Sequence, residues 1–557
     1  TNVRRSIGRC VDMMNSTYRN GAMLSSTQSS NVQTASLKTS FKTPEGRYKL
    51  HYEKAHHSGL LHYAHGKSVS LVTLAQLKEK QPQPAPSSSS SATSSVKFAA
   101  AKLLGGGNGS RALSFVGSNG STKSNGGNNR SGPLGGSASS GSLINSNFDG
   151  KGTYLLFNVG DTLFISDFNS HDKDPIKSIH FSISNPLCHA FDPEAKDGHD
   201  LLIGLSSGDV YSVSLRQQLQ DFGKKLVAAQ HYNKDGAVNS SRCTSVAWVP
   251  EGNGAFVVAH ADGNLYVYEK SKDSTADTSF PAVKDQTQFS AAHARSSKSN
   301  PIARWHICEG AINSIAFSAD GTYLATVGRD GYLRVFDYSR EQLICGGKSY
   351  YGALLCCAWS VDGKYILTGG EDDLVQVWSM DDRKVVAWGE GHNSWVSGVS
   401  FDPYWSSPAS DGGENVMYRF GSVGQDTQLL LWDLSMDEIV VPLRRCPPGG
   451  SPRYSSGSQS CHWDTTTPLV GALQPAPSMR DVPKLSPLVA HRVHSEPLSG
   501  IIFTQESITT ACREGHLKIW ARPGAAESQP CTESPLSAGG AKEKSLLPGK
   551  ASGSSQK

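Results

Sequence analysis

A short unit recurs along this chain with a fixed internal spacing. Each copy runs from a small residue through a polar turn into an alternating strand that ends in an aromatic residue. A weaker copy at 203–213 carries Ser207 at the position of the turn acid. Repetition of this kind predicts an array of similar structural units. In the five clear copies the turn acid and the aromatic stand six positions apart, in the pairs Asp262/Tyr268, Asp330/Phe336, Asp372/Trp378, Asp426/Trp432 and Glu514/Trp520.

A second strand precedes each unit, as in CTSVAWVP (243–250) and INSIAFSADG (312–321). The order of inner strand, turn, middle strand, acidic turn and third strand corresponds to three strands of a four-stranded blade. Six blades are evident, and we expect a seventh from ALSFVG (112–117) and GTYLLFNVGDTLFISDF (152–168). The 42 residues from Phe336 to Trp378 match the ~40 to 45 of a WD repeat. The sequence therefore predicts an all-β, seven-bladed WD-repeat β-propeller.

Composition sets the expected boundaries of this propeller, which we place at 41–523. Ser and Gly fill 31 of the 70 positions in 81–150, too little apolar content to offset the entropy of ordering. We expect a disordered insertion there, inside the first blade, and disordered ends at 1–40 and 524–557. A Pro-rich insertion at about 442–487 accounts for the long interval before Trp520, and long surface loops cost little free energy.

The ends of the ring need a closing contact, because a propeller leaves only short, protected sheet edges. The segment FKTPEGRYKLHYE (41–53) is the ordered segment that precedes the first blade. We expect it to pair with the blade that ends at Trp520.

Charge and hydropathy narrow the classes of partner. Lys plus Arg number 53 against 49 Asp plus Glu, a net charge of +4, and the two signs are interspersed, so we expect neither nucleic acid nor a membrane as partner. No apolar run approaches the ~20 residues of a membrane helix, and no secretory pattern opens the chain. The 11 Cys lie mostly in apolar runs such as ALLCCAW (353–359), which is typical of a reducing compartment. We expect a cytoplasmic and/or nuclear protein.

His392, Ser422 and Asp426 present the three residue types of a Ser-His-Asp triad. Thr326, Thr368 and Thr510 hold the position of Ser422 in other blades, and a residue type that repeats blade after blade belongs to the scaffold. We interpret the set as a structural hydrogen-bonded tetrad like that of WD repeats, since buried polar groups need partners. The first tetrad is His392, Ser422, Asp426 and Trp432, and a second, diverged copy is His494, Thr510, Glu514 and Trp520.

Other motifs carry no chemistry that we can identify. LLGGGNGS (103–110) lacks the Gly-Lys-Ser/Thr of a phosphate loop, and HGKS (65–68) lacks its first glycine. The Cys-His pairs at 188–189 and 461–462 lack a second pair at ligand spacing. We expect no catalytic residue, no cofactor, no metal and no small-molecule substrate.

Three aromatic residues stand in loops that enter successive blades: Tyr350, Tyr351 and Trp395. Bulky aromatics there have no slot in the core between blades, and exposed Tyr and Trp are enriched among interface hot spots. We interpret all three as partner-binding residues. For Tyr350 an equal alternative is that it fills the position of a missing tetrad histidine.

Long motifs carry a family resemblance over about 41–523. They are GKSYYGALLCCAWSVDGKYILTGGEDDLVQVWSMDDRKVVAWGEGHNSWVSGVSFDPYW, YRFGSVGQDTQLLLWDL, FKTPEGRYKL, PSMRDVPKLSPLV and TACREGHLKIWARPG. In these the chain resembles the WD-repeat family of the dystrophia myotonica WD-repeat protein and fungal CreC, most closely its plant-type members. It departs from the family in its Ser/Gly insertion and in carrying Tyr rather than Phe at position 351.

The resemblance implies a regulatory subunit that binds and activates or stabilises a ubiquitin-specific protease. It also implies that Tyr351 and Trp395 match family aromatics that contact the protease. We therefore expect a non-catalytic scaffold of a deubiquitinase complex.

Two other functions stay open. The first is a substrate receptor of a cullin-type ubiquitin ligase, or another general interaction propeller. Such receptors usually carry Arg or Lys two residues after a Trp-Asp pair, whereas Trp432-Asp433 is followed by Leu434 and Ser435. The second is a hydrolytic enzyme, although the sequence outside the repeats offers no set of catalytic residues that would support it.

Overall fold

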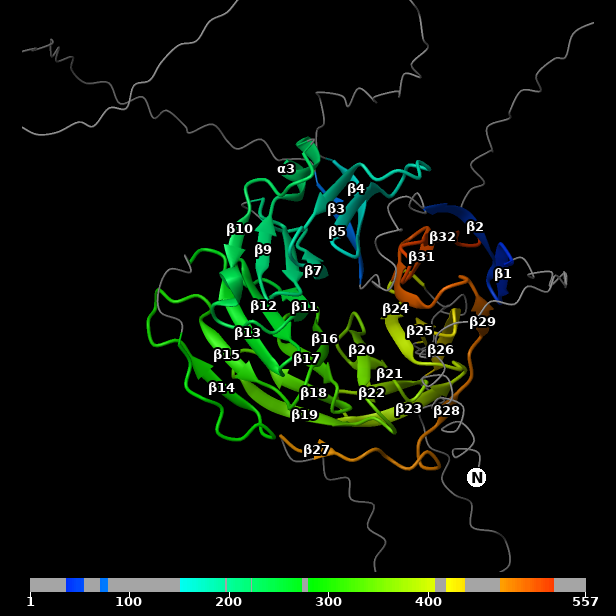
Figure 1. Ribbon diagram of the computed structural model, residues 1–557. Coiled ribbons are helices and arrows are strands. Elements are labelled where there is room, and N and C mark those ends of the chain that lie inside the picture. Colours follow the sequence, from blue (N-terminus) through cyan, green and yellow to red (C-terminus); the bar gives the residue numbers. More distant parts are fainter. Residues whose placement is uncertain are drawn as a thin grey trace, which may run out of the picture.

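Seven β-sheets stand around a central axis and form a closed ring (Figure 1). The computed structural model describes residues 37–54, 71–78, 151–195, 198–221, 223–272, 279–405, 417–435 and 471–524. The prediction of an all-β, seven-bladed propeller is confirmed. No helix within these ranges is long and apolar enough to cross a membrane.

Each blade has an inner, a second, a third and an outer strand. Blade 1 contains β3 (Val72–Leu77), β4 (Gly152–Val159), β5 (Thr162–Asp167) and β6 (Lys177–His180). Blade 2 contains β7 (Pro186–Phe191), β8 (Leu201–Leu205), β9 (Val210–Val213) and β10 (Gln230–Tyr232). Blade 3 contains β11 (Cys243–Trp248), β12 (Ala255–His260), β13 (Asn264–Glu269) and β15 (Ala303–His306), with β14 (Ser290–His293) as a fifth strand.

The remaining blades follow the same plan. Blade 4 contains β16 (Ile312–Phe317), β17 (Tyr323–Gly328), β18 (Tyr332–Asp337) and β19 (Gln342–Lys348). Blade 5 contains β20 (Leu354–Trp359), β21 (Tyr365–Gly370), β22 (Leu374–Ser379) and β23 (Lys384–Glu390). Blade 6 contains β24 (Val396–Phe401), β25 (Met417–Gly424), β26 (Gln428–Ser435) and β29 (Val489–Arg492). Blade 7 contains β30 (Leu498–Phe503), β31 (Ser507–Cys512), β32 (Leu517–Ala521), β2 (Gly46–Lys54) and β1 (Ser40–Thr43).

The inner strand of blade 1 differs from the expected one. It is β3, which pairs with β4 at Ala75↔Tyr154, whereas ALSFVG (112–117) lies outside the described residues. The physical reason is a set of specific contacts that apolar content alone does not indicate. Thr73 Oγ1 lies 2.8 Å from His189 Nδ1 on the inner strand of blade 2, and Ala75 and Leu77 are buried in the core between the two blades.

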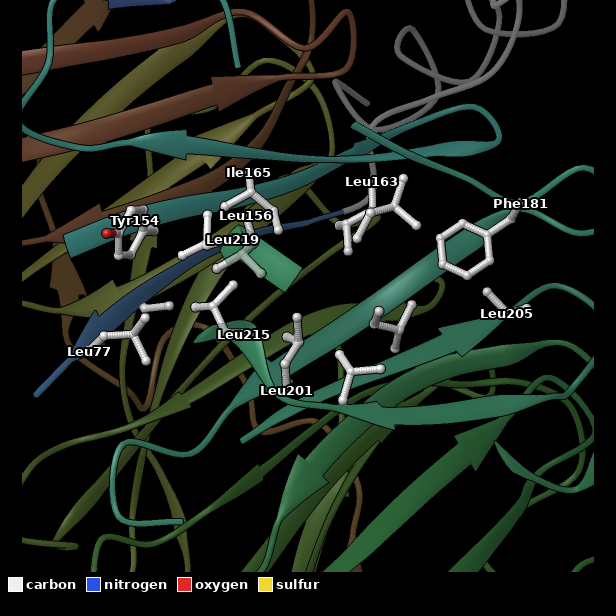
Figure 2. Close-up of a cluster of buried hydrophobic side chains, with 14 residues drawn as sticks. Leu77, Tyr154, Leu156, Leu163, Ile165, Phe181, Leu201, Leu205, Leu215 and Leu219 are labelled. Atoms are coloured by element: carbon white, nitrogen blue, oxygen red, sulfur yellow. The ribbon is translucent and has the colours of Figure 1, made fainter. Parts of the chain in front are cut away.

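That core is typical of the spaces between blades. Figure 2 shows Leu77, Tyr154 and Leu156 of blade 1 facing Leu201 and Leu205 of blade 2. The helix α3 (Leu215–Gln220) covers one end with two buried leucines, and the Ser214 side chain caps its first turn by accepting from the Gln217 N–H. A short 3-10 helix, η1 (Lys234–Gly236), follows β10.

The N-terminal hairpin closes the ring, as predicted. Strand β2 pairs with β32 at Leu50↔Trp520 and lies beside it in Figure 1. The Lys54 ammonium donates to the carbonyls of Ser170 (2.7 Å) and Asp172 (2.9 Å) in blade 1. On the other side Glu45 pairs with Arg419 of blade 6. One segment thus joins blade 7 to both of its neighbours.

The predicted Pro-rich insertion (442–487) contains ordered structure in its second half, residues 471–487. Strand β27 (Leu473–Gln474) pairs in parallel with β19, and β28 (Lys484–Leu485) pairs in parallel with β23. Residues 471–488, which we call the strap, therefore run along the outer edges of blades 4 and 5 before the chain enters β29 (Figure 1). The predicted disordered tracts, 81–150 and most of 1–40 and 524–557, lie outside the described residues.

Candidate functional site

One end of the ring carries the residues that the sequence singles out. Neighbouring strands of a blade are antiparallel, so the turns between second and third strands lie at the same end as the connections from one blade to the next. We call this end the docking face. Tyr351 lies on it in the connection from β19 to β20, and Trp395 lies on it in the connection from β23 to β24.

His392, Ser422, Asp426 and Trp432 form a continuous hydrogen-bonded chain beneath this face. His392 Nδ1 lies 3.1 Å from both Asp426 carboxylate oxygens, and its Nε2 lies 2.8 Å from Ser422 Oγ. The Trp432 indole donates to the same hydroxyl at 2.9 Å. Burial raises the pKa of Asp426, but the bonds from His392 and the Asn393 N–H outweigh it, so that the pKa is lowered. Ser422 is wholly buried with its hydroxyl engaged, an arrangement that fixes a loop on a strand rather than exposing a nucleophile.

The second, diverged tetrad in blade 7 is less complete than the first. His494 Nε2 lies 2.9 Å from Thr510 Oγ1, which also accepts from the Trp520 indole at 3.1 Å. Burial is the main cause that lowers the pKa of His494 to about 3. Among the described residues no hydrogen bond joins His494 to Glu514, whose side chain is exposed. The structure thus brings together three of the four residues.

Blade 5 carries the same plan with a tyrosine in place of the histidine. The Trp378 indole donates to Thr368 Oγ1 at 3.1 Å, and the backbone N–H of Tyr350 donates to Asp372 at 3.2 Å. The Tyr350 hydroxyl is buried and has no hydrogen-bond partner among the described residues. Burial raises the pKa of Tyr350 to about 12 and that of Asp372 to about 6. Tyr350 is therefore less exposed than Tyr351, and both interpretations of it, as a partner-binding residue and as the substitute for a tetrad histidine, stay predictions.

Tyr351 and Trp395 project from rigid supports. Their side chains are 69% and 36% exposed. The loop of Tyr351 is fixed to the adjacent turn by the bonds Ala353 N–H to Glu371 Oε2 (3.0 Å) and Glu371 N–H to Ala353 carbonyl (2.9 Å). The carbonyl of Trp395 accepts from the Gln425 N–H at 2.9 Å in the same way. The structure therefore presents two exposed aromatics on connections at either side of blade 5.

The sequence analysis overlooked a third exposed apolar residue of the docking face. Ile183, in the connection from β6 to β7, is 98% exposed. The hydroxyl of Ser184 holds this loop, since it lies 2.9 Å from Ser206 Oγ and accepts from the Ser207 N–H at 2.9 Å. The signal in the sequence is an isoleucine between two serines in FSISNP, too short to distinguish from an ordinary loop.

The chain was compared with protein families, with known proteins and with solved structures. The family model described as "WD domain, G-beta repeat" matches residues 300–337 and 345–379. WD repeat-containing protein 20 of Mus musculus is 33% identical over 511 residues, which cover 67% of this chain and 88% of that protein. A solved structure titled "Crystal Structure of Mitotic Checkpoint Complex" aligns over 66% of this chain and 84% of the other at 13% identity and a TM-score of 0.41, a likeness too low to bear on function.

Proposed function

Because the chain belongs to the WD40-repeat family, as a relative of WD repeat-containing protein 20, we propose that its propeller is a non-catalytic regulatory subunit of a ubiquitin-specific protease. The observation that carries the proposal is the pair of exposed aromatics on neighbouring connections. The motif resemblance to the dystrophia myotonica and CreC type supports it, because that resemblance implies that Tyr351 and Trp395 match family aromatics that contact the protease. The complex would act in the cytoplasm and/or the nucleus.

The proposed mechanism is a population shift. Tyr351 and Trp395 would bury their rings in apolar pockets of the protease, and buried aromatic anchors of this kind dominate interface energetics. A subunit that binds the competent conformation of an enzyme more tightly than the idle one raises the populated fraction of the competent state. A differential affinity of about 1–3 kcal/mol corresponds to roughly a 5- to 150-fold shift. Rigid loops suit this task, because pre-organised loops lose little entropy on binding.

The test is a turnover assay with purified components. Each ubiquitin-specific protease of the source organism is assayed on a fluorogenic ubiquitin substrate with and without saturating full-length chain. We expect at least one protease to gain activity, and Trp395→Ala to raise the concentration needed for half-maximal activation by about tenfold or more. Tyr404→Ala is the matched control, because Tyr404 is 53% exposed in the connection between β24 and β25 at the opposite end of the ring. Unchanged turnover for every protease at saturating chain would refute the proposal.

A further inference from the structure

The turn between the second and third strands differs in the two blades that flank Trp395. In blades 2, 3, 4 and 7 the residue that follows the turn-acid position is a glycine with left-handed φ. Blades 5 and 6 carry Asp373 (φ 63°) and Thr427 (φ 68°) there. Left-handed backbone favours glycine, and a side chain held there is strained, most of all a β-branched one. The four glycines are Gly208 (φ 91°), Gly263 (φ 81°), Gly331 (φ 79°) and Gly515 (φ 79°).

Three of these glycines, Gly208, Gly263 and Gly331, leave room for the connection that departs from their blade. A Cβ on Gly263 would lie 1.8 Å from the Cys308 carbonyl oxygen. A Cβ on Gly331 would lie 2.4 Å from the Gly352 carbonyl oxygen. In blade 5 Asp373 stands at the corresponding position of the turn and carries a side chain.

Asp373 lies in the turn between the two aromatic loops. On one side its neighbour Asp372 accepts from the Tyr350 N–H at 3.2 Å, in the loop that carries Tyr351. On the other side the charges of Asp426 and His392 act on the Asp373 carboxyl, and His392 belongs to the loop that carries Trp395.

The Asp373 carboxylate is the one acid of this trio without a partner. Asp372 and Asp426 accept several hydrogen bonds each. Asp373 is half-buried, and no hydrogen bond or ion pair engages its carboxylate within the described part of the chain. Burial first, and then the Asp426 carboxylate, raise its pKa, while His392 opposes them. The Asp373 carboxylate is therefore partly desolvated beside a second acid, and a basic group brought next to it would stabilise its charged form.

We propose that Asp373 is a specificity-determining residue of the docking face and receives a basic side chain, arginine or lysine, of the bound protease between Tyr351 and Trp395. The inference rests on the proposed function and adds the chemistry of the contact. A guanidinium there makes charge-assisted hydrogen bonds with the carboxylate. Its planar face also stacks on Tyr351 or Trp395, the residue types that bind cations best. A wholly apolar partner surface would gain nothing from the acid.

The experiment measures binding of the full-length chain to the activated protease at 50 and 500 mM NaCl. Asp373→Asn keeps the shape of the side chain and tolerates left-handed φ, but removes the charge. We expect roughly tenfold weaker binding at low salt and a smaller loss of affinity between the two salt concentrations than in the wild type. Glu514→Gln is the matched control, because it removes one exposed acid of the corresponding turn in blade 7 and leaves both readouts unchanged.

A second variant separates charge from spacing. Asp373→Gly relieves the strained φ, so we expect its melting temperature to equal or exceed that of the wild type while binding weakens as in Asp373→Asn. Wild-type affinity and salt dependence for Asp373→Asn would overturn the proposal, and weakening by the glycine variant alone would assign Asp373 a spacing role instead. Trp395→Ala and Tyr351→Ala report separately on the proposed function, since wild-type binding by both would refute that function whatever Asp373 does.

Discussion

Two adjacent threonines in β31 allow a direct test of what the hydrogen-bonded sets contribute to stability. Thr509 and Thr510 are both wholly buried. Thr510 Oγ1 is bonded to His494 and Trp520, whereas Thr509 Oγ1 has no hydrogen-bond partner among the described residues. Valine has the shape of threonine without its hydroxyl. The same substitution at the two positions should therefore change stability in opposite directions.

The magnitudes follow from the groups left behind. Thr510→Val strands the buried His494 imidazole and Trp520 indole, and each unsatisfied group costs about 1–3 kcal/mol. We expect the free energy of unfolding to fall by about 2–6 kcal/mol in total. Thr509→Val removes a buried hydroxyl that makes no bond, so we expect no loss and a gain of up to ~1 kcal/mol.

Differential scanning calorimetry at one scan rate measures both variants. At about 2 °C per kcal/mol for a domain of this size, Thr510→Val should lower the melting temperature by roughly 4–12 °C, while Thr509→Val leaves it equal or higher. Equal shifts for the two variants would show that the hydroxyl bonds of the set do not stabilise the blade, and the reasoning would fail.

Three further predictions concern pH, the strap and closure. Burial holds the pKa of His494 at about 3, below that of a histidine in the unfolded chain. The unfolded state therefore binds a proton first as the pH drops below ~6.5, and the folded state loses about 2 kcal/mol of stability by pH 5. We expect His494→Gln to show a smaller fall in melting temperature between pH 7.5 and 5 than the wild type. Leu485→Ala, at a strap residue that is 3% exposed, should cost about 2–3 kcal/mol in chemical denaturation, whereas Leu488→Ala, at a residue that is 38% exposed, should cost under ~1 kcal/mol. Deletion of 1–54 removes β2 and should lower the melting temperature by several degrees, and an unchanged value would contradict the closure of the ring by this segment.

The ring could be predicted because its signal is local and repeated. The six-residue interval from turn acid to aromatic places one residue at a tight turn and the other in the core, as at Asp426 and Trp432, so each copy reports its own blade. The inner strand of blade 1 could not be predicted in this way. VTLAQL (72–77) is identified by a hydrogen bond between Thr73 and His189 on another blade, a contact between residues far apart in the sequence. The strap could not be predicted from the sequence for the same reason, because its strands pair with blades 4 and 5, which lie far earlier in the chain.

Some residues of the candidate site could likewise be predicted from local sequence, and others could not. Loop position and residue type were enough to single out Tyr351 and Trp395 as exposed aromatics. The buried hydroxyl of Tyr350 depends on packing against blade 5, which no periodicity encodes. Asp373 was overlooked because its importance lies in a backbone angle and in the missing partner of its carboxylate, and both appear only when the six comparable turns are superimposed in space.

Hydrogen–deuterium exchange of the chain with and without its protease tests the central claim most directly. Binding through the docking face predicts new protection of amides in the connections 349–353 and 391–395 and in the turn 371–373. Protection confined to the opposite end of the ring, at the turns 319–322 and 361–364, would contradict it.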